Sequence, residues 1–270
     1  MKLFLITLIV FIAAALLIYI ISCRTLTVSR TVVILPGIDR EYTVVHLADM
    51  HKKYWGDDNS RLCSIIDEIA PDAILCTGDM TDTVDTGSSP FAAMVKNLSG
   101  RFPVYLSLGN HEARLKTGYP FGAKSYFDEL RRSGVVILDN ESAKLFGRIR
   151  LYGYSFDYET KPDKTLLDRI FGEPEQPSIL MAHDPGYAEE YAEWGCGLIL
   201  SGHIHGGAIR IPFVGGVLSP DKKLFPKYDS GLYDVKGKKL YVSRGVGYYF
   251  PDRFLSFPEL SVIKLMPENP

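Results

Sequence analysis

Cysteine and histidine are scarce in this sequence, and the chain has no surplus of positive charge. The 270 residues include four cysteines, at positions 23, 63, 76 and 196, with no paired spacing. The sequence therefore predicts neither a disulfide framework nor a zinc knuckle. The formal net charge of −2 argues against a nucleic-acid partner, because such surfaces carry excess Lys and Arg. With 46% hydrophobic residues, the chain is large enough for one sizeable core.

The longest apolar run lies at the N-terminus. Leu3–Ile21 is almost entirely apolar, with Lys2 before it and Arg24 after it. At about 1.5 Å per residue, a helix of this length spans the ~30 Å hydrocarbon core of a bilayer. The run is also longer than the ~7–15 apolar residues of a signal peptide. The sequence therefore predicts a single-pass membrane anchor in residues 1–23.

Two questions about the anchor stay open at this level. Ile20-Ile21-Ser22-Cys23 also fits a relaxed lipoprotein cleavage box, which would leave Cys23 as a lipid-bearing N-terminus. Lys2 favours a cytoplasmic N-terminus, while arginines after the apolar run pull the other way. We expect an uncleaved anchor with the rest of the chain outside the cytoplasm.

Strand-like and helix-like segments alternate after the anchor and then give way to hairpins. The expected strands are Thr25–Leu35, Tyr42–Ala48, Ser142–Phe146, Arg148–Tyr154, Leu232–Val235, Lys239–Ser243 and Leu260–Leu265. The expected helices are Asn59–Ile69, Phe91–Leu98 and Ser125–Ser133. This order predicts an α/β fold of two sheets packed face to face with helices outside. We expect a linker with the first strand in 24–41, one domain in 42–267, and a functional loop in Gly206–Gly231.

Five short apolar runs each end in a cluster of Asp, His or Asn. The clusters are Asp49 with His51, Gly78-Asp79, Gly109-Asn110-His111-Glu112, His183, and Gly202-His203-Ile204-His205. Runs of this length indicate buried strands, and loops at strand ends commonly carry function. Asp, Asn and neutral imidazole together suit divalent transition metals, and two adjacent metals suit attack on phosphorus. The sequence therefore predicts a two-metal phosphoesterase.

The spacing inside the clusters supports shared ligation. Asp49 and His51 stand two apart, so in an extended segment both point to one face and can reach one ion. His203 and His205 repeat this spacing. Asp79 follows a glycine, where two ions about 3.5–4 Å apart could share its carboxylate. His183 and Asn110 complete two ligand sets that have Asp79 in common.

The ordered motifs resemble those of the calcineurin-like metallophosphoesterase superfamily. The resemblance covers about Tyr42 to Leu265, and the tail looks like a bacterial membrane-associated branch. It implies a two-sheet αββα sandwich and metal-dependent hydrolysis of phosphate esters. It assigns one ion to Asp49, His51, Asp79 and His205, and a second to Asp79, Asn110, His183 and His203. It also implies that His111 is catalytic, with Glu112 as its orienting carboxylate. The implied cofactors are two divalent ions, manganese first, with iron or zinc as alternatives.

Substrate contacts rest on weaker patterns. Arg114, Arg244 and Arg253 are candidate phosphate contacts; the alternatives are a surface ion pair for Arg114 and ties between the C-terminal tail and the sheet for the other two. Aromatic residues of the late loops either rim a site for a lipid-like substrate or pack on the core. These aromatics are Phe213, Phe225, Tyr228, Tyr248, Tyr249 and Phe250.

The membrane anchor and these aromatics favour an amphiphilic phosphate ester, such as a UDP-diacylglucosamine-type compound. Phosphodiesters, monoesters and pyrophosphates all remain open as the bond that is cleaved. The alternatives are a soluble nucleotide or cyclic-nucleotide phosphodiesterase and a non-catalytic metal-binding membrane scaffold. The sequence gives no oligomeric state.

Overall fold

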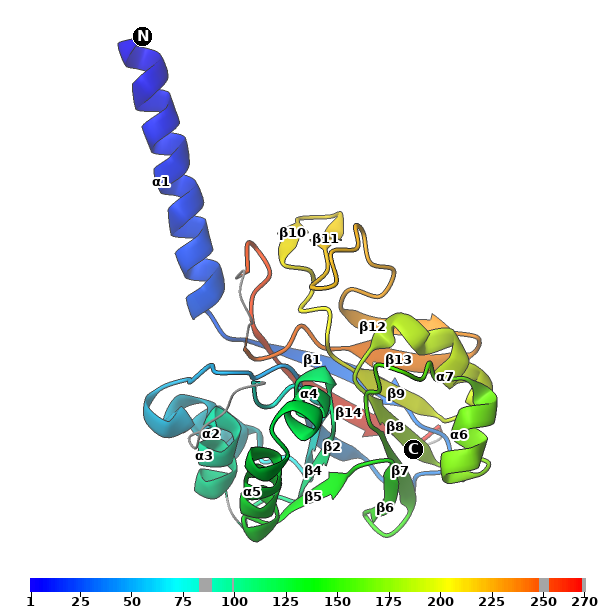
Figure 1. Cartoon of the computed structure of the whole chain (residues 1–270). Coiled ribbons are helices and arrows are strands. Elements are labelled where there is room, and N and C mark those ends of the chain that lie inside the picture. Colours follow the sequence, from blue (N-terminus) through cyan, green and yellow to red (C-terminus); the bar gives the residue numbers. More distant parts are fainter. Residues whose placement is uncertain (83–88, 99, 248–252, 269–270) are drawn as a thin grey trace.

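The N-terminal apolar run forms one long helix that projects from the rest of the chain. Figure 1 shows the computed structural model, which describes residues 1–82, 89–98, 100–247 and 253–268. Helix α1 (Lys2–Arg24) is 23 residues long and is exposed over almost its whole length until Ser22 and Cys23. A membrane anchor is expected to be an apolar helix that no protein surface covers. Helix α1 is long and apolar enough to cross a membrane.

Two large sheets make up the centre of the molecule. The first contains β1 (Thr27–Ile34), β2 (Tyr42–Leu47), β3 (Ala73–Cys76), β4 (Val104–Ser107), β5 (Val135–Leu138) and β14 (Glu259–Met266). The second contains β6 (Glu141–Leu145), β7 (Ile149–Tyr154), β8 (Ser178–Ala182), β9 (Leu198–Ser201), β12 (Gly231–Val235) and β13 (Lys238–Val242). Their strand orders are β1-β14-β2-β3-β4-β5 and β12-β13-β9-β8-β7-β6. Separately, β10 (Ile209–Ile211) and β11 (Gly215–Leu218) pair as an antiparallel ribbon.

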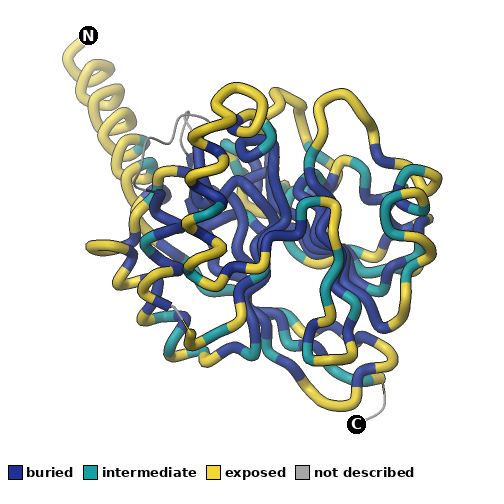
Figure 2. The backbone as a smooth tube through the Cα atoms, turned by 60° about the horizontal axis from the view of Figure 1, so that its bottom comes forward, coloured by how far each residue is buried: buried dark blue, intermediate teal, exposed yellow. Residues whose placement is uncertain are grey.

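Helices cover the outer face of each sheet. They are α2 (Ser60–Ile69), α3 (Pro90–Leu98), α4 (Asn110–Gly118), α5 (Pro120–Arg132), α6 (Lys164–Phe171) and α7 (Ala188–Trp194). Successive strand residues point to opposite faces, so in β2 Val45 packs under α2 and α3 while Val44 packs between the sheets. A third apolar cluster joins the second sheet to α6 and α7. The strands are buried and the outer helices half-exposed (Figure 2), which confirms the αββα sandwich.

Most of the expected elements are present, with three differences. Helix α4 was not expected; it begins after Gly109, whose N–H donates to the Glu112 carboxylate and so caps the helix. Helix α5 begins at Pro120 rather than Ser125, because proline suits the first helical position. The expected loop Gly206–Gly231 contains the β10–β11 ribbon.

Strand β1, the expected first strand, belongs to the first sheet. It pairs in parallel with β14 along its whole length, from Thr27 opposite Glu259 to Ile34 opposite Met266. The sheet therefore starts at Thr27, three residues after α1 ends. Tyr248, Tyr249 and Phe250 lie outside the described residues.

Candidate metal centre

The motif residues converge where the two sheets meet. Asp49 and His51 follow β2, Asp79 follows β3, and Asn110 opens α4 after β4. From the second sheet, His183 follows β8, and His203 and His205 follow β9. These strands are neighbours within their sheets, so their carboxyl ends bring the loops together. All seven residues are at most 8% exposed.

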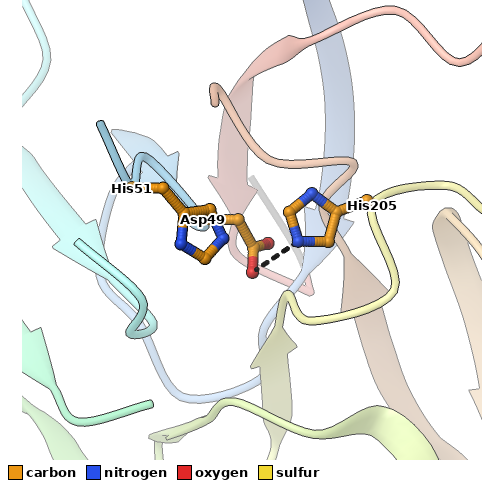
Figure 3. Close-up of side chains that lie close together, drawn as sticks. All are labelled: Asp49, His51 and His205. Carbon is orange, nitrogen blue, oxygen red and sulfur yellow. Dashed lines mark ion pairs between the residues drawn. The ribbon is translucent and has the colours of Figure 1, made fainter. Parts of the chain in front are cut away.

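Ligand-type atoms form three overlapping groups. The groups are Asp49, His51 and His205; His51, Asp79 and His111; and Asp79, His183 and His203, each with its donor atoms within 4.8 Å of one another. Figure 3 shows the first group, in which His205 Nε2 lies 3.6 Å from Asp49 Oδ1. The rings of His51 and His205 are stacked, with their centres 5.3 Å apart. Asn110 joins the third group, since its Oδ1 lies 3.1 Å from His183 Nε2. Asp79 and His51 each belong to two groups.

The loops that carry these residues adopt strained backbone conformations. Asp49, Asp79 and His205 have φ values of 53°, 55° and 56°, which cost about 1–3 kcal/mol each and concentrate at functional sites. A Cβ on Gly78 would lie 2.3 Å from the backbone nitrogen of Gly109. Only glycine therefore allows the Asp79 loop to lie against the loop that starts α4.

The hydrogen bonds of His183 fix its donor geometry. Its Nδ1 lies 2.7 Å from the carbonyl oxygen of Thr77, and a carbonyl only accepts, so Nδ1 carries the hydrogen. In the neutral ring the lone pair is then on Nε2, which faces Asp79 Oδ2 at 3.2 Å. A ligand imidazole is normally oriented by such a hydrogen bond from its other nitrogen. This arrangement fits a cation between His183, Asp79 and Asn110.

Burial and neighbouring charges shift the pKa values of the side chains in the centre. Burial raises the pKa of Asp49 to about 6, and burial lowers the pKa of His51 to about 3, so His51 is neutral and able to ligate. Burial also opposes charge on His183, but Asp79 and Asp49 raise its pKa to about 10. The carboxylates thus hold a proton where a metal ion would supply the positive charge, and the donor set fits divalent cations.

His205 is held by Arg253. The Nη2 of Arg253 lies 3.1 Å from His205 Nδ1, and its Nη1 donates to the His205 carbonyl oxygen. A guanidinium only donates, so Nδ1 accepts here and the neutral ring carries its hydrogen on Nε2, facing Asp49. Ligation through Nε2 would require this contact to Arg253 to rearrange.

Arg253 is therefore not a phosphate clamp. Its side chain is buried, at 1% exposed, and also donates to the carbonyl oxygens of Gly245 and Gly247. Arg244 pairs with Glu259 at the start of β14 and donates to Thr27. These contacts agree with the alternative role for both arginines, which ties the C-terminal tail to the sheet, and a phosphate contact stays a prediction for Arg244.

The resemblance implied that Glu112 orients His111, but in the structure it does not. Its carboxylate accepts from the backbone amides of Asp79, Met80, Thr81 and Gly109 at 2.8, 2.7, 3.3 and 2.9 Å. The helical position of Glu112, three residues after Gly109, turns it toward these amides and away from the ring. Glu112 therefore joins the Asp79 loop to the start of α4.

The carboxylate beside His111 belongs to Asp82. Its Oδ1 lies 3.0 Å from His111 Nδ1, and Lys52 pairs with its other oxygen. The sequence offered a signal that was overlooked, because Asp82 is an acidic residue three positions after Asp79 in the same loop. His203 also has an unexpected partner, because its Nε2 lies 3.1 Å from Asp221 Oδ2. Asp221 lies in the loop expected at Gly206–Gly231, where no sequence pattern indicated this contact.

Arg114 lies at the edge of the centre. Its guanidinium carbon is 5.3 Å from the centre of the Tyr158 ring, and the Tyr158 hydroxyl donates to the carbonyl oxygen of Asn110. The exposed side chain of Arg114 can therefore approach a ligand at the metal centre, and its role as a phosphate contact stays a prediction.

Comparison with known proteins agrees with this geometry. The profile of the calcineurin-like phosphoesterase family matches residues 42–207. The chain belongs to this family. It is 30% identical to the uncharacterized metallophosphoesterase YkuE of Bacillus subtilis, over 84% of this chain and 80% of that protein. It is 27% identical to the phosphodiesterase YaeI of Escherichia coli, over 83% and 82%.

A third relative acts on a lipid-linked compound. The UDP-2,3-diacylglucosamine pyrophosphatase LpxG of Chlamydia trachomatis is 29% identical over 52% of this chain and 44% of its own length. Members of the family depend on two metal ions. The chain is thus a metal-dependent hydrolase of phosphate esters.

Proposed function

We propose that this chain is a membrane-anchored phosphoesterase that cleaves an amphiphilic phosphate ester with two divalent cations. One cation would bind Asp49, His51, Asp79 and His205, and the other Asp79, Asn110, His183 and His203. The observation that carries this proposal is the membership of Asp79 in two donor groups, one with His51 and one with His183 and His203. A shared carboxylate suits a pair of ions at catalytic spacing. We propose manganese, with iron or zinc as alternatives, because carboxylate, amide and imidazole donors suit all three.

His111 would act on the leaving group. When bound, the two cations activate a water and offset the charge of the phosphoryl oxygens. The Nε2 of His111 lies 3.9 Å from Asp79 Oδ2, at the border of the centre, while Nδ1 faces Asp82. Burial lowers the pKa of His111, but the Asp82 hydrogen bond and the charge of Asp79 outweigh it, so the pKa is raised. The ring therefore keeps a proton that Nε2 can give to a leaving alkoxide.

A cavity beside the metal centre supports an amphiphilic substrate. It has a volume of about 480 Å³ and is lined by Arg210 and Arg244 together with apolar side chains that include Leu255 and Phe257. It adjoins the centre through Gly206, the residue after His205, whose carbonyl oxygen accepts from Arg210. A lining that combines arginine side chains with apolar ones suits a phosphate joined to a hydrocarbon. The name of LpxG makes a UDP-diacylglucosamine-type compound the first candidate.

Helix α1 would hold the enzyme at the membrane, with the catalytic domain of residues 42–267 outside the cytoplasm. The Cys23 thiol is buried and lies 3.6 Å from the carbonyl oxygen of Arg253, which favours a spanning helix over a lipid-bearing Cys23. Resistance of the membrane-bound protein to alkaline carbonate, and digestion of the domain by protease added to intact cells, test the anchor and its orientation.

Metal analysis of two variants tests the centre. Asp79→Ala should lose both ions, because one carboxylate serves both, whereas His111→Ala should keep the metal and lose about 10²–10⁴-fold in rate. Hydrolysis of an aryl phosphate ester after addition of manganese provides the rate. Loss of metal from the His111 variant would contradict its catalytic role, and two bound ions without turnover would indicate the scaffold alternative.

The substrate is tested by comparing lipid-linked phosphate esters with soluble ones. We expect a higher kcat/KM for the lipid-linked compounds in mixed micelles. A strong preference for small nucleotides or cyclic nucleotides, unchanged by detergent or lipid, would favour the soluble-substrate alternative. This outcome would leave the metal assignment intact.

A further inference from the structure

The β10–β11 ribbon carries an exposed apolar surface that the metal centre does not use. At its turn, Phe213 and Val214 are 110% and 62% exposed. Leu224 and Phe225, at 67% and 61%, extend this surface, because Leu224 bridges to Leu218 and the Phe225 amide donates to Val217 of β11. We call these four side chains the ribbon patch. Exposed apolar side chains gathered on one small element mark an interaction surface.

The ribbon patch is connected to the end of the proposed anchor by hydrogen bonds. The amide of Leu255 donates to Ser22 Oγ in the last turns of α1. The neighbouring Phe254 pairs with β10, since its carbonyl accepts from Arg210 and its amide donates to Ala208. One extended segment therefore separates α1 from β10, and hydrogen-bonded strands lie about 4.8 Å apart. In Figure 1 both α1 and the ribbon project from the same side of the molecule.

Positive charge accompanies the patch. Lys222 and Lys223 are exposed in the turn that joins Leu218 to Leu224, and Arg24 is exposed at the end of α1. The two acidic groups nearest in sequence are paired, Asp221 with His203 and Asp229 with Arg210. An apolar surface beside lysines and arginine suits the interface of a bilayer that contains anionic lipids.

We propose that the ribbon patch is a second membrane contact, inserted into the headgroup region on the side where α1 leaves the bilayer. This proposal rests on α1 as the proposed anchor. With two points of attachment, the domain would no longer swing freely about α1. The cavity lined by Arg210, Phe213 and Leu255 would then open toward the lipid surface.

Tryptophan fluorescence in the full-length protein tests the contact. We would reconstitute Phe213→Trp and Phe225→Trp variants into anionic vesicles whose lipids carry bromine near the carbonyl end of the acyl chain, and subtract the emission of the unmodified protein. The control is Lys144→Trp, at an exposed position of β6, which lies on the far side of the molecule from α1 (Figure 1). We expect bromine-dependent quenching of both ribbon variants and none of the control, with a smaller effect when bromine sits deep in the bilayer.

The outcomes separate the contact from the anchor. Ribbon variants quenched no more than Lys144→Trp, in protein that resists carbonate extraction, would refute the contact and leave the anchor standing. A blue shift without bromine-dependent quenching would also refute it, because protein and not lipid would then cover the patch. Quenching in protein that carbonate releases would support the contact and refute the spanning helix. Replacing Lys222 and Lys223 by glutamine should reduce quenching in anionic vesicles and leave it unchanged in neutral ones.

Discussion

Replacement of Glu112 by glutamine distinguishes a structural carboxylate from a catalytic one. One oxygen of Glu112 accepts from Met80 and Thr81, and the other from Asp79 and Gly109. Glutamine keeps one oxygen and presents an NH₂ group to the other two amides. Each buried amide without an acceptor costs about 1–3 kcal/mol, so the free energy of unfolding should fall by about 2–6 kcal/mol. For a domain of this size the melting temperature should fall by about 4–24 °C.

The measurement is thermal unfolding of the detergent-solubilised protein in the presence of a chelator, so that metal binding does not mask the loss. The matched control is Glu129→Gln on the exposed face of α5, which should stay within about 0.5 kcal/mol of the unmodified protein. If Glu112→Gln melts like this control and instead shifts the pH dependence of kcat, Glu112 is the partner of His111 after all.

Two further variants test neighbouring contacts. Asp82→Asn removes a charge that raises the pKa of His111; the imidazolium is then lost at lower pH, and the high-pH limb of kcat should move to lower pH while the melting temperature changes little. An unshifted limb would contradict the pairing. A chain beginning at Thr25 loses the hydrogen bonds between Ser22 and Leu255 and between Cys23 and Arg253. Its free energy of unfolding should be about 1–2 kcal/mol lower than that of a chain beginning at Ile18. Equal stability would show that these contacts contribute nothing.

The proposed metal ligands could be chosen from the sequence because their positions follow from regular structure. A short buried strand brings the residue after it to the edge of its sheet, so Asp49 and Asp79 come together after neighbouring strands, and the packing of the second sheet adds His183. Hydrophobic alternation likewise located β2 and the hairpin of β6 and β7. These features depend on local periodicity and on parallel pairing, both of which can be seen in a single sequence.

The partners of the ligands were harder to predict, because they depend on which way a side chain turns. Glu112 follows His111 directly, but one step along a helix is a rotation of about 100°, so the two side chains point in different directions. Asp82, 29 residues away in sequence, faces the ring instead. Adjacency in a motif therefore predicted the wrong orienting carboxylate, and only the packing of two loops identifies the right one.

Three consecutive residues join helix α1, the ribbon and the candidate metal centre. The carbonyl of Arg253 faces Cys23 while its side chain holds His205. Phe254 pairs with β10, and Leu255 binds Ser22. A displacement of α1 relative to the ribbon must therefore break one of these bonds or move Arg253, and with it the contact to His205. The position of a candidate metal ligand is thus coupled to α1 through a segment that no sequence motif marks.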